Sequence, residues 1–289
     1  MPDVFVGDST NYRIQVFDPK GTYKRKWGSY GTGNGQFNIP TGISVYKGEV
    51  FVGDRENDRI QVFALNGTFK RKWGSTGTGN GQFKRPYGVS IYKDEVFITD
   101  YLNYRVQVFA FDGTFKRKWG SYGTGNGQFR RPPGVSVYKD EVFVTDQDNN
   151  RVQVFTLGGT FKRKWGSTGT GNGQFNYPIG VFVLKEEVFI ADQNNNRIQV
   201  FALDGTFKRK WGSYGTEDGQ FKAPVGVLVL GNEVFVTDNS NHRVQVFALY
   251  GTFKRKWGSY GTEDGKFRNP WGIFIPAGKI QYLPLMGMG

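Results

Sequence analysis

The chain has 289 residues, a net charge of +13, 37% hydrophobic residues, 42 glycines and no cysteine. This composition is typical of a turn-rich globular protein, and it excludes a disulfide scaffold, a thiolate metal site and a disordered chain. One of the longest apolar runs, Val225 to Leu230, is far too short to cross a bilayer. Met1-Pro2-Asp3 leads into strand-like residues without a signal sequence. We therefore expect no membrane span, and a cytoplasmic location by default.

The sequence repeats every 46 residues, and its clearest landmark is an Asp followed five residues later by an Arg. The six pairs are Asp8 and Arg13, Asp54 and Arg59, Asp100 and Arg105, Asp146 and Arg151, Asp192 and Arg197, and Asp238 and Arg243. The length alone would suggest two domains. A uniform repeat instead indicates one closed unit.

Each repeat unit predicts four β-strands, because short runs of β-branched and aromatic residues alternate with Gly, Asn, Asp or Pro. In a typical copy these runs are, in chain order, Gly88 to Tyr92, Glu95 to Thr99, Arg105 to Phe109 and Phe115 to Trp119. Short connections make consecutive strands antiparallel, and no window has the 3.6-residue period of a helix. A four-stranded meander repeated six times predicts an all-β fold, a six-bladed β-propeller whose radial closure protects the sheet edges.

The two ends of the chain are predicted to share one blade. Residues 4–27 supply a second, third and fourth strand but no first strand, whereas a sixth first strand, Trp271 to Ile275, comes near the C-terminus. We therefore expect the C-terminal strand to complete the N-terminal blade and close the ring. The propeller would occupy residues 1–276, and residues 277–289 would be a degenerate tail in which Pro284 replaces the repeated Asp.

Several motifs resemble those of the NHL-repeat family. The resemblance is carried by Asp238 to Phe247, which includes Asn241-His242-Arg243, and by the segments Phe253 to Gly258, Asp264 to Phe267 and Pro270 to Ile273. It covers nearly the whole chain and implies a six-bladed propeller. The family's functions include RNA binding, partner recognition and receptor sensing, and related propellers act as lyases or lactonases. The resemblance therefore does not choose the function.

Catalytic residues, metals and cofactors are expected to be absent. A metal-dependent propeller enzyme needs converging His or carboxylate ligands, and the chain has one histidine, His242, in a strand connection. A calcium site made of carboxylates alone, with Asp218 or Asp264, is the remaining metal alternative, although Asp218 lies in a segment typical of a turn. The glycine-rich Gly31 to Gly35 is not followed by the helix that a phosphate-binding loop needs.

The six Asp and Arg pairs are predicted to be structural. A ligand site rarely needs six identical copies, whereas every blade must fix the connection between its second and third strands. A carboxylate five residues before an Arg can reach the guanidinium across a tight β-connection. The same reasoning assigns the repeated aromatic positions, represented by Phe5, Phe17, Trp27 and Phe37, to packing between blades.

A Lys-Arg-Lys triplet in each outermost strand, such as Lys24-Arg25-Lys26, predicts a basic belt around the rim. Charges on an outer sheet edge discourage edge-to-edge aggregation, and this interpretation is preferred because it needs no ligand. The alternative is a dedicated anion-binding rim. In either case the belt should attract nucleic acid or acidic surfaces in a salt-dependent way.

The copies differ most on one face of the ring. The connections between second and third strands and the links between blades emerge there, and we call it the variable face; the opposite, more uniform side is the turn face. The residues predicted to bind a partner on the variable face are Lys84, Arg85, Tyr87, Tyr101, Tyr104, Arg130, Arg131, Tyr177, His242, Arg268 and Trp271. Cations interleaved with aromatic rings suit single-stranded nucleic acid, and Tyr, Trp and Arg also suit a protein epitope. Drift in exposed loops would explain the differences without any ligand.

The innermost strands are also unequal. Ser44, Ser90 and Ser136 stand where the other three copies have Phe182, Leu228 and Phe274. Either the central channel is lined unevenly, or the packing between blades differs between the two halves. We prefer packing, because core volume must be filled in every blade.

Together these observations predict a monomeric, non-enzymatic binding scaffold whose variable face recognises RNA or another acidic partner, such as an acidic protein. The alternative is a protein-interaction platform or sensor domain that binds no nucleic acid. A metal-dependent lyase or lactonase is the least favoured function. Salt-dependent RNA affinity distinguishes the first two.

Overall fold

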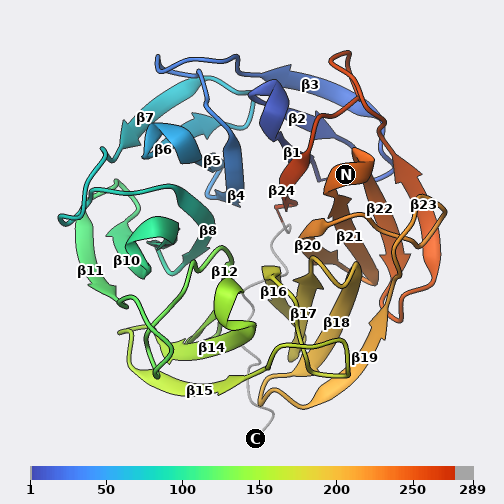
Figure 1. Cartoon of the computed structure of the whole chain (residues 1–289). Helices are drawn as coiled ribbons and strands as arrows, with labels where there is room; N and C mark the ends of the chain where they lie inside the picture. Colours follow the sequence, from blue (N-terminus) through green and yellow to red (C-terminus); the bar gives the residue numbers. More distant parts are fainter. Residues whose placement is uncertain (1, 277–289) are drawn as a thin grey trace, which may run out of the picture.

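A computed structural model describes residues 2–276 and places six β-sheets in a ring (Figure 1). Each sheet has four antiparallel strands, ordered from the axis of the ring to its rim. The predicted all-β, six-bladed propeller is confirmed. The predicted tail, residues 277–289, lies outside the described residues.

The blades are numbered in chain order, and the strands of each blade are given from the innermost to the outermost. Blade 1 contains β24 (Pro270–Phe274), β1 (Val4–Asp8), β2 (Arg13–Phe17) and β3 (Tyr23–Trp27). Blade 2 contains β4 (Pro40–Tyr46), β5 (Glu49–Asp54), β6 (Arg59–Ala64) and β7 (Phe69–Trp73). Blade 3 contains β8 (Pro86–Tyr92), β9 (Glu95–Asp100), β10 (Arg105–Ala110) and β11 (Phe115–Trp119).

The other three blades follow the same order. Blade 4 contains β12 (Val135–Tyr138), β13 (Glu141–Asp146), β14 (Arg151–Thr156) and β15 (Phe161–Trp165). Blade 5 contains β16 (Pro178–Leu184), β17 (Glu187–Asp192), β18 (Arg197–Ala202) and β19 (Phe207–Trp211). Blade 6 contains β20 (Pro224–Leu230), β21 (Glu233–Asp238), β22 (Arg243–Ala248) and β23 (Phe253–Trp257).

The ring closes as the strand count predicts. β24 pairs antiparallel with β1, with Phe274 opposite Phe5 and Ile273 opposite Val6. Blade 1 is therefore built from β24 and from the first three strands of the chain, and Figure 1 shows β24 beside β1. This pairing covers the inner edge of β1, which an open arrangement would leave unpaired.

The core lies between neighbouring blades. At the boundary of blades 3 and 4, for example, Phe129 and Phe155 are fully buried with their ring centroids 5.6 Å apart, and Trp119 of blade 3 lies 5.8 Å from Phe155. Equivalent clusters occur at the other boundaries. The repeated aromatic residues thus pack one blade onto the next, which explains why every copy keeps them.

Short 3₁₀ helices are the main local feature that the strand pattern does not predict. They lie between the second and third strands of five blades: η1 (Ser9–Asn11), η2 (Arg55–Asn57), η3 (Tyr101–Asn103), η4 (Gln147–Asn149) and η5 (Asn239–Asn241). A residue in the left-handed conformation ends each of them, as Tyr104 does at φ 57°. A single turn of this kind is too short to produce helical periodicity in the sequence.

Acidic residues neutralise much of the basic belt. In blade 3, Lys116 and Arg117 both form ion pairs with Glu95 at the start of β9, and Arg117 Nη1 lies 2.8 Å from Glu95 Oε1. Arg117 also donates to the Leu157 carbonyl of blade 4 at 2.7 Å. The acids that pair with the first Lys and the Arg of the other triplets are Asp3, Glu49, Glu141, Glu187 and Glu233.

These ion pairs predict acid sensitivity. The hydrogen bond from Arg117 lowers the pKa of Glu95 to about 2, and the equivalent Arg residues do the same for Glu141, Glu187 and Glu233. A lowered pKa stabilises the fold above the unfolded-state value near 4.5, and this stabilisation disappears as the pH falls toward about 2. Replacing the four Glu residues by Gln should lower the urea midpoint at pH 7 and leave it nearly unchanged at pH 2. An equal loss at both pH values would contradict this assignment.

Candidate binding face

The six Asp and Arg pairs fix both kinds of connection on the variable face. In blade 3, Arg105 Nε donates to Asp100 Oδ2 at 2.7 Å, while its Nη1 and Nη2 atoms donate to the carbonyls of Thr78 and Gly79 at 2.6 and 2.8 Å. Asp100 also accepts a hydrogen bond of 2.8 Å from the backbone N–H of Lys84. The same Arg-to-Asp bond, 2.7 Å long, recurs in the other five blades. Each pair therefore anchors the link that arrives from the preceding blade.

Both partners of each pair are buried, so their charges depend on each other. Burial raises the pKa of Asp100, and hydrogen bonds from Lys84, Asn103 and Arg105 oppose this effect. The pKa values of the five equivalent carboxyls are raised for the same reason. The guanidinium thus offsets the free-energy cost of burying an ionised carboxylate.

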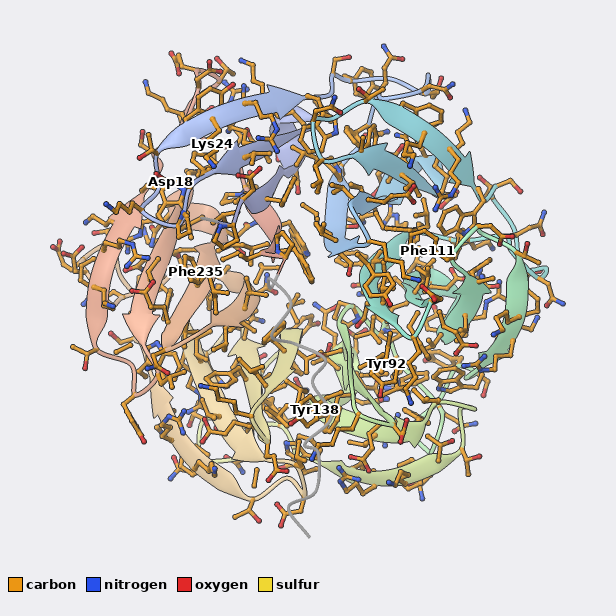
Figure 2. All side chains as sticks on the ribbon, turned by 180° about the vertical axis from the view of Figure 1, so that it is seen from behind. Asp18, Lys24, Tyr92, Phe111, Tyr138 and Phe235 are labelled. Carbon is orange, nitrogen blue, oxygen red and sulfur yellow. The ribbon has the colours of Figure 1, made fainter. Side chains whose placement is uncertain are left out.

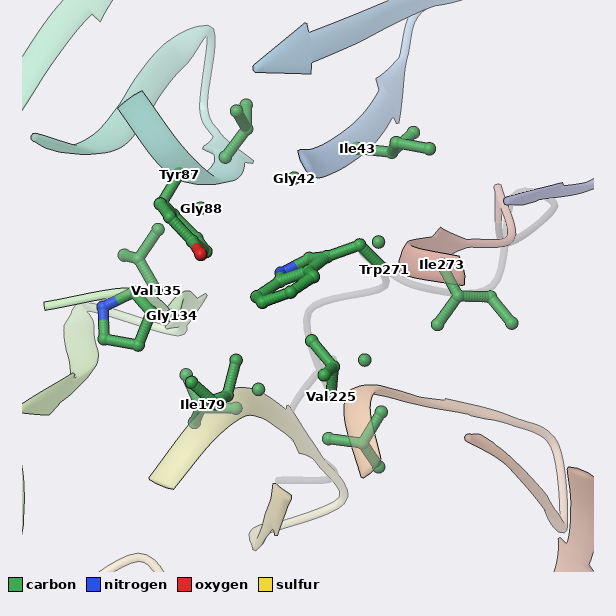
Figure 3. Close-up of a pocket in the computed structure, with 17 residues that line it drawn as sticks. Gly42, Ile43, Tyr87, Gly88, Gly134, Val135, Ile179, Val225, Trp271 and Ile273 are labelled. Atoms are coloured by element: carbon green, nitrogen blue, oxygen red, sulfur yellow. The ribbon is translucent and has the colours of Figure 1, made fainter. Parts of the chain in front are cut away.

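Three of the predicted aromatic residues gather where the variable face meets the axis of the ring. Tyr87 and Tyr101 stack with ring centroids 4.7 Å apart. The Trp271 ring lies 5.3 Å from Tyr87, and Figure 3 shows both side chains at the small cavity. Tyr87 and Tyr101 are only 5% and 9% exposed, and the Tyr101 hydroxyl donates to Gln147 Oε1 at 2.7 Å. The prediction that these two rings face a partner therefore needs correction. Trp271 is half-buried and remains partly accessible.

The predicted cations fall into two groups. Arg85 Nε lies 3.1 Å from Glu56 Oε2, and Arg131 Nε lies 3.4 Å from Asp148 Oδ2, so acids of the same face neutralise both. Within residues 2–276, no ion pair is formed by Lys84, Arg130 or Arg268. The two arginines instead lie over tyrosine rings, at 5.3 Å for Arg130 and Tyr122 and 5.0 Å for Arg268 and Tyr260.

The three remaining predicted residues have different surroundings. Tyr104 packs edge-on against Tyr122 at 5.0 Å, and Tyr177 is exposed between blades 4 and 5. His242 is half-buried: its Nδ1 accepts a 3.1 Å hydrogen bond from the backbone N–H of Asn269, and its ring packs on Tyr260. Burial lowers the pKa of His242, so the ring is neutral at pH 7 and supports the neighbouring link.

Four exposed tyrosines on the variable face are absent from the predicted set. They are Tyr30, Tyr122, Tyr214 and Tyr260, with exposures of 64%, 59%, 69% and 61%. Each stands three residues after the last Trp of an outer strand, where the two other copies have Thr76 and Thr168. The alternation of Tyr and Thr at this position of the repeat could have identified these four residues as a variable part of the surface.

A cationic side chain from the same link lies over the ring of three of these tyrosines. Lys222 Nζ lies 5.4 Å from the centroid of Tyr214, which adds a third pair to those of Arg130 with Tyr122 and Arg268 with Tyr260. The pairs lie at equivalent positions of the links that enter blades 4, 6 and 1. A ring under each cation restrains the side chain. The tyrosines are exposed, whereas the three cations are half-buried.

The central channel has a narrow part and a wide part. A cavity of about 90 Å³ lies beside Trp271, where a glycine in five of the innermost strands, and Gly134 just before β12, allow the strands to approach closely (Figure 3). A Cβ on Gly180, for example, would overlap the carbonyl oxygen of Val225. The wide part, about 1380 Å³, opens on the turn face.

The unequal residues of the innermost strands line the wide part. Ser44, Ser90, Ser136, Phe182 and Phe274 all border it, and Leu228 is buried in the core. Packing, which we preferred, and an uneven channel lining therefore occur together: Ser44 and Ser136 are buried, and Ser90 and Ser136 accept hydrogen bonds from the next blade. Phe182 and Phe274 serve both purposes, since they also pack against the cluster shared by blades 6 and 1.

Within residues 2–276, no group of three or more His, Cys, Asp or Glu side chains lies close enough together to hold a metal ion. No helix in that part of the chain has the length and apolar character needed to cross a membrane.

Comparison with known proteins gives matches to families and folds. A family model described as a 6-bladed beta-propeller matches residues 128–212, and the NHL repeat model matches residues 37–63 and 221–247. No curated protein sequence gives a significant match. Among solved structures, a chain in the crystal structure of a nidogen/laminin complex is similar with a TM-score of 0.69 and 16% identity, over 95% of this chain and 98% of that one. At this identity the likeness concerns the fold alone.

Proposed function

We propose that this chain, a six-bladed β-propeller in which two segments match the NHL repeat, is a non-enzymatic scaffold that binds an acidic segment of another protein on its variable face. The observation that carries this proposal is the set of three cation and tyrosine pairs, Tyr122 with Arg130, Tyr214 with Lys222, and Tyr260 with Arg268. Tyr and Arg are enriched at the energetic centres of protein interfaces. A carboxylate can bind the guanidinium while the adjacent ring provides apolar contact.

The scaffold holds these pairs in place. Arg130 follows the fully buried Phe129, and its backbone N–H donates to Asp146 Oδ1 at 2.7 Å. Arg268 has the same bond to Asp8, also at 2.7 Å. A side chain restrained before binding loses less conformational entropy in the complex. The buried Asp and Arg network thus prepares the surface that we propose for recognition.

A protein partner fits this face better than RNA, although the same pairs would also suit phosphates and bases. Base stacking needs free ring faces, and Tyr87 and Tyr101 are buried against each other. Continuous phosphate binding needs unpaired cations, yet Glu56 and Asp148 neutralise Arg85 and Arg131. The face therefore offers separate points of contact within a mixed-charge surface, which is typical of a protein interface.

The test is selection of peptides from a random displayed library, followed by fluorescence anisotropy of the recovered peptides. We expect peptides that contain Asp or Glu, and we expect the double variant Arg130→Ser and Arg268→Ser to weaken binding about tenfold or more, as loss of interface anchors does. The matched control is Lys118→Ser with Lys164→Ser, which removes the same net charge from the outer strands.

A parallel titration uses single-stranded RNA over a range of salt concentrations. Tight, salt-dependent RNA binding without any acidic peptide would favour RNA recognition and overturn the protein proposal. Equal effects of the two double variants would show that net charge, rather than the variable face, determines binding.

A further inference from the structure

A second site lies in the wide part of the channel, on the face opposite the proposed protein-binding surface. This cavity of about 1380 Å³ ends at the narrow glycine-lined part, where Trp271 and Tyr87 converge. Figure 2 shows two of its lining residues, Tyr92 and Tyr138, toward the centre of the ring and Lys24 at the rim. Clefts of several hundred Å³ commonly hold small ligands, so the size is sufficient.

The wall of the cavity changes character from one half to the other. Blades 2 to 4 contribute apolar residues such as Val45, Ile91 and Val137, and beside them the more polar Ser44, Ser90, Ser136, Tyr46, Tyr92 and Tyr138. The hydroxyls of Ser90 and Ser136 accept hydrogen bonds from the backbone N–H groups of Val137 and Val183. Blades 5 and 1 contribute the apolar side chains of Phe182, Leu184, Phe274 and Pro276. An occupant that matches this wall has one apolar side and one polar side.

Lysines alternate with acids at the mouth of the cavity. The hairpin that ends each innermost strand of blades 2 to 4 places a lysine next to an acid of the following blade. The three ion pairs are Lys47 with Asp94 at 2.7 Å, Lys93 with Asp140 at 3.2 Å and Lys139 with Glu186 at 2.9 Å. Three of the lysines that line this mouth are thus neutralised.

The alternation stops at Lys185 of blade 5. The following hairpin has Gly231-Asn232, whereas the hairpins of blades 3 to 5 have a lysine followed by an acid. Within residues 2–276 no ion pair involves Lys185, which lines the cavity. The residue before Lys185 is Leu184, whereas a tyrosine ring lies under each paired lysine. Lys185 is therefore a cation without an acidic partner, beside the apolar half of the wall.

We infer that the channel binds an amphipathic carboxylate, such as a medium-chain fatty acid, with its head group at Lys185 and its chain along Phe182 and Phe274. The carboxylate would occupy the place that Asp94, Asp140 and Glu186 take beside the other lysines. The alkyl chain would cover partly exposed rings and release water from them. This inference is independent of the variable face.

The experiment is calorimetric titration of the full chain with sodium decanoate at low ionic strength. We expect saturable 1:1 binding, and we expect Lys185→Gln to weaken it about tenfold, the effect of losing a charge-assisted hydrogen bond. Lys93→Gln is the matched control: it removes the same charge from an equivalent hairpin where Asp140 already pairs with the lysine, and it should leave the affinity within about twofold. Decanol, which has the same chain without the charge, should bind more weakly than decanoate.

A second variant tests the apolar wall. Phe182→Ser introduces the serine that blades 2 to 4 have at the equivalent position. It should weaken decanoate binding about fivefold or more, because apolar contact with the alkyl chain is lost. Thermal unfolding and circular dichroism of each variant check that it is folded. Failure of the wild-type chain to bind decanoate, or equal losses in Lys185→Gln and Lys93→Gln, would overturn the inference.

Discussion

A chain that ends at Asn269, and so lacks β24, will not form a stable monomer. β24 contributes the buried Ile273 and precedes the buried Ile275, and burial of such side chains stabilises a fold by about 1.5–3 kcal/mol each. Its loss also removes the partner of Val6 and uncovers the inner edge of β1. An uncovered strand edge favours pairing between chains. We expect aggregation, or a loss of unfolding free energy above about 5 kcal/mol from the two isoleucines and the broken ladder.

The control is a chain that ends at Pro276, which keeps every strand of the ring. Size-exclusion chromatography with light scattering measures the oligomeric state, and urea unfolding measures the stability. The control should be monomeric and should unfold in one transition. If the chain without β24 behaved in the same way, closure by β24 would not be essential to the fold.

Replacing Arg105 by Leu should destabilise the protein by about 3–5 kcal/mol, because it leaves the carboxylate of Asp100 buried without its charge partner. It also removes the donors to the carbonyls of Thr78 and Gly79, which belong to the preceding link. Urea unfolding at pH 7 measures the effect. Burial already raises the pKa of Asp100, so loss of the guanidinium should raise it further and make the damage smaller at pH 5 than at pH 7.

Two further variants serve as controls for Arg105→Leu. Lys118→Leu, which removes a cation from an outer strand, should change stability by less than about 0.5 kcal/mol, as most surface substitutions do. The double variant Asp100→Leu and Arg105→Leu should recover part of the stability lost by Arg105→Leu alone, because the uncompensated charge is gone. A single variant as stable as Lys118→Leu would show that the pair is not essential.

The repeated features were the most predictable from the sequence. The 46-residue interval predicted six blades and the closure by residues 271–275, because strand alternation and turn residues are local signals that six copies reinforce. The bond of Arg105 to Asp100 followed from a five-residue spacing across a tight connection. Its second role, holding the preceding blade, did not follow, since that contact joins residues 27 apart in the chain.

The candidate sites depended on contacts between blades. The sequence by itself determined which residues vary on one face, but burial at the convergence of neighbouring blades removed Tyr87 and Tyr101 from the surface. The cation and tyrosine pairs, the neutralised triplets and the unpaired Lys185 likewise became visible only in three dimensions. A periodic sequence specifies strands and their order, because these follow from local geometry. The exposure and charge partners of a side chain depend on which distant residues the closed ring brings beside it.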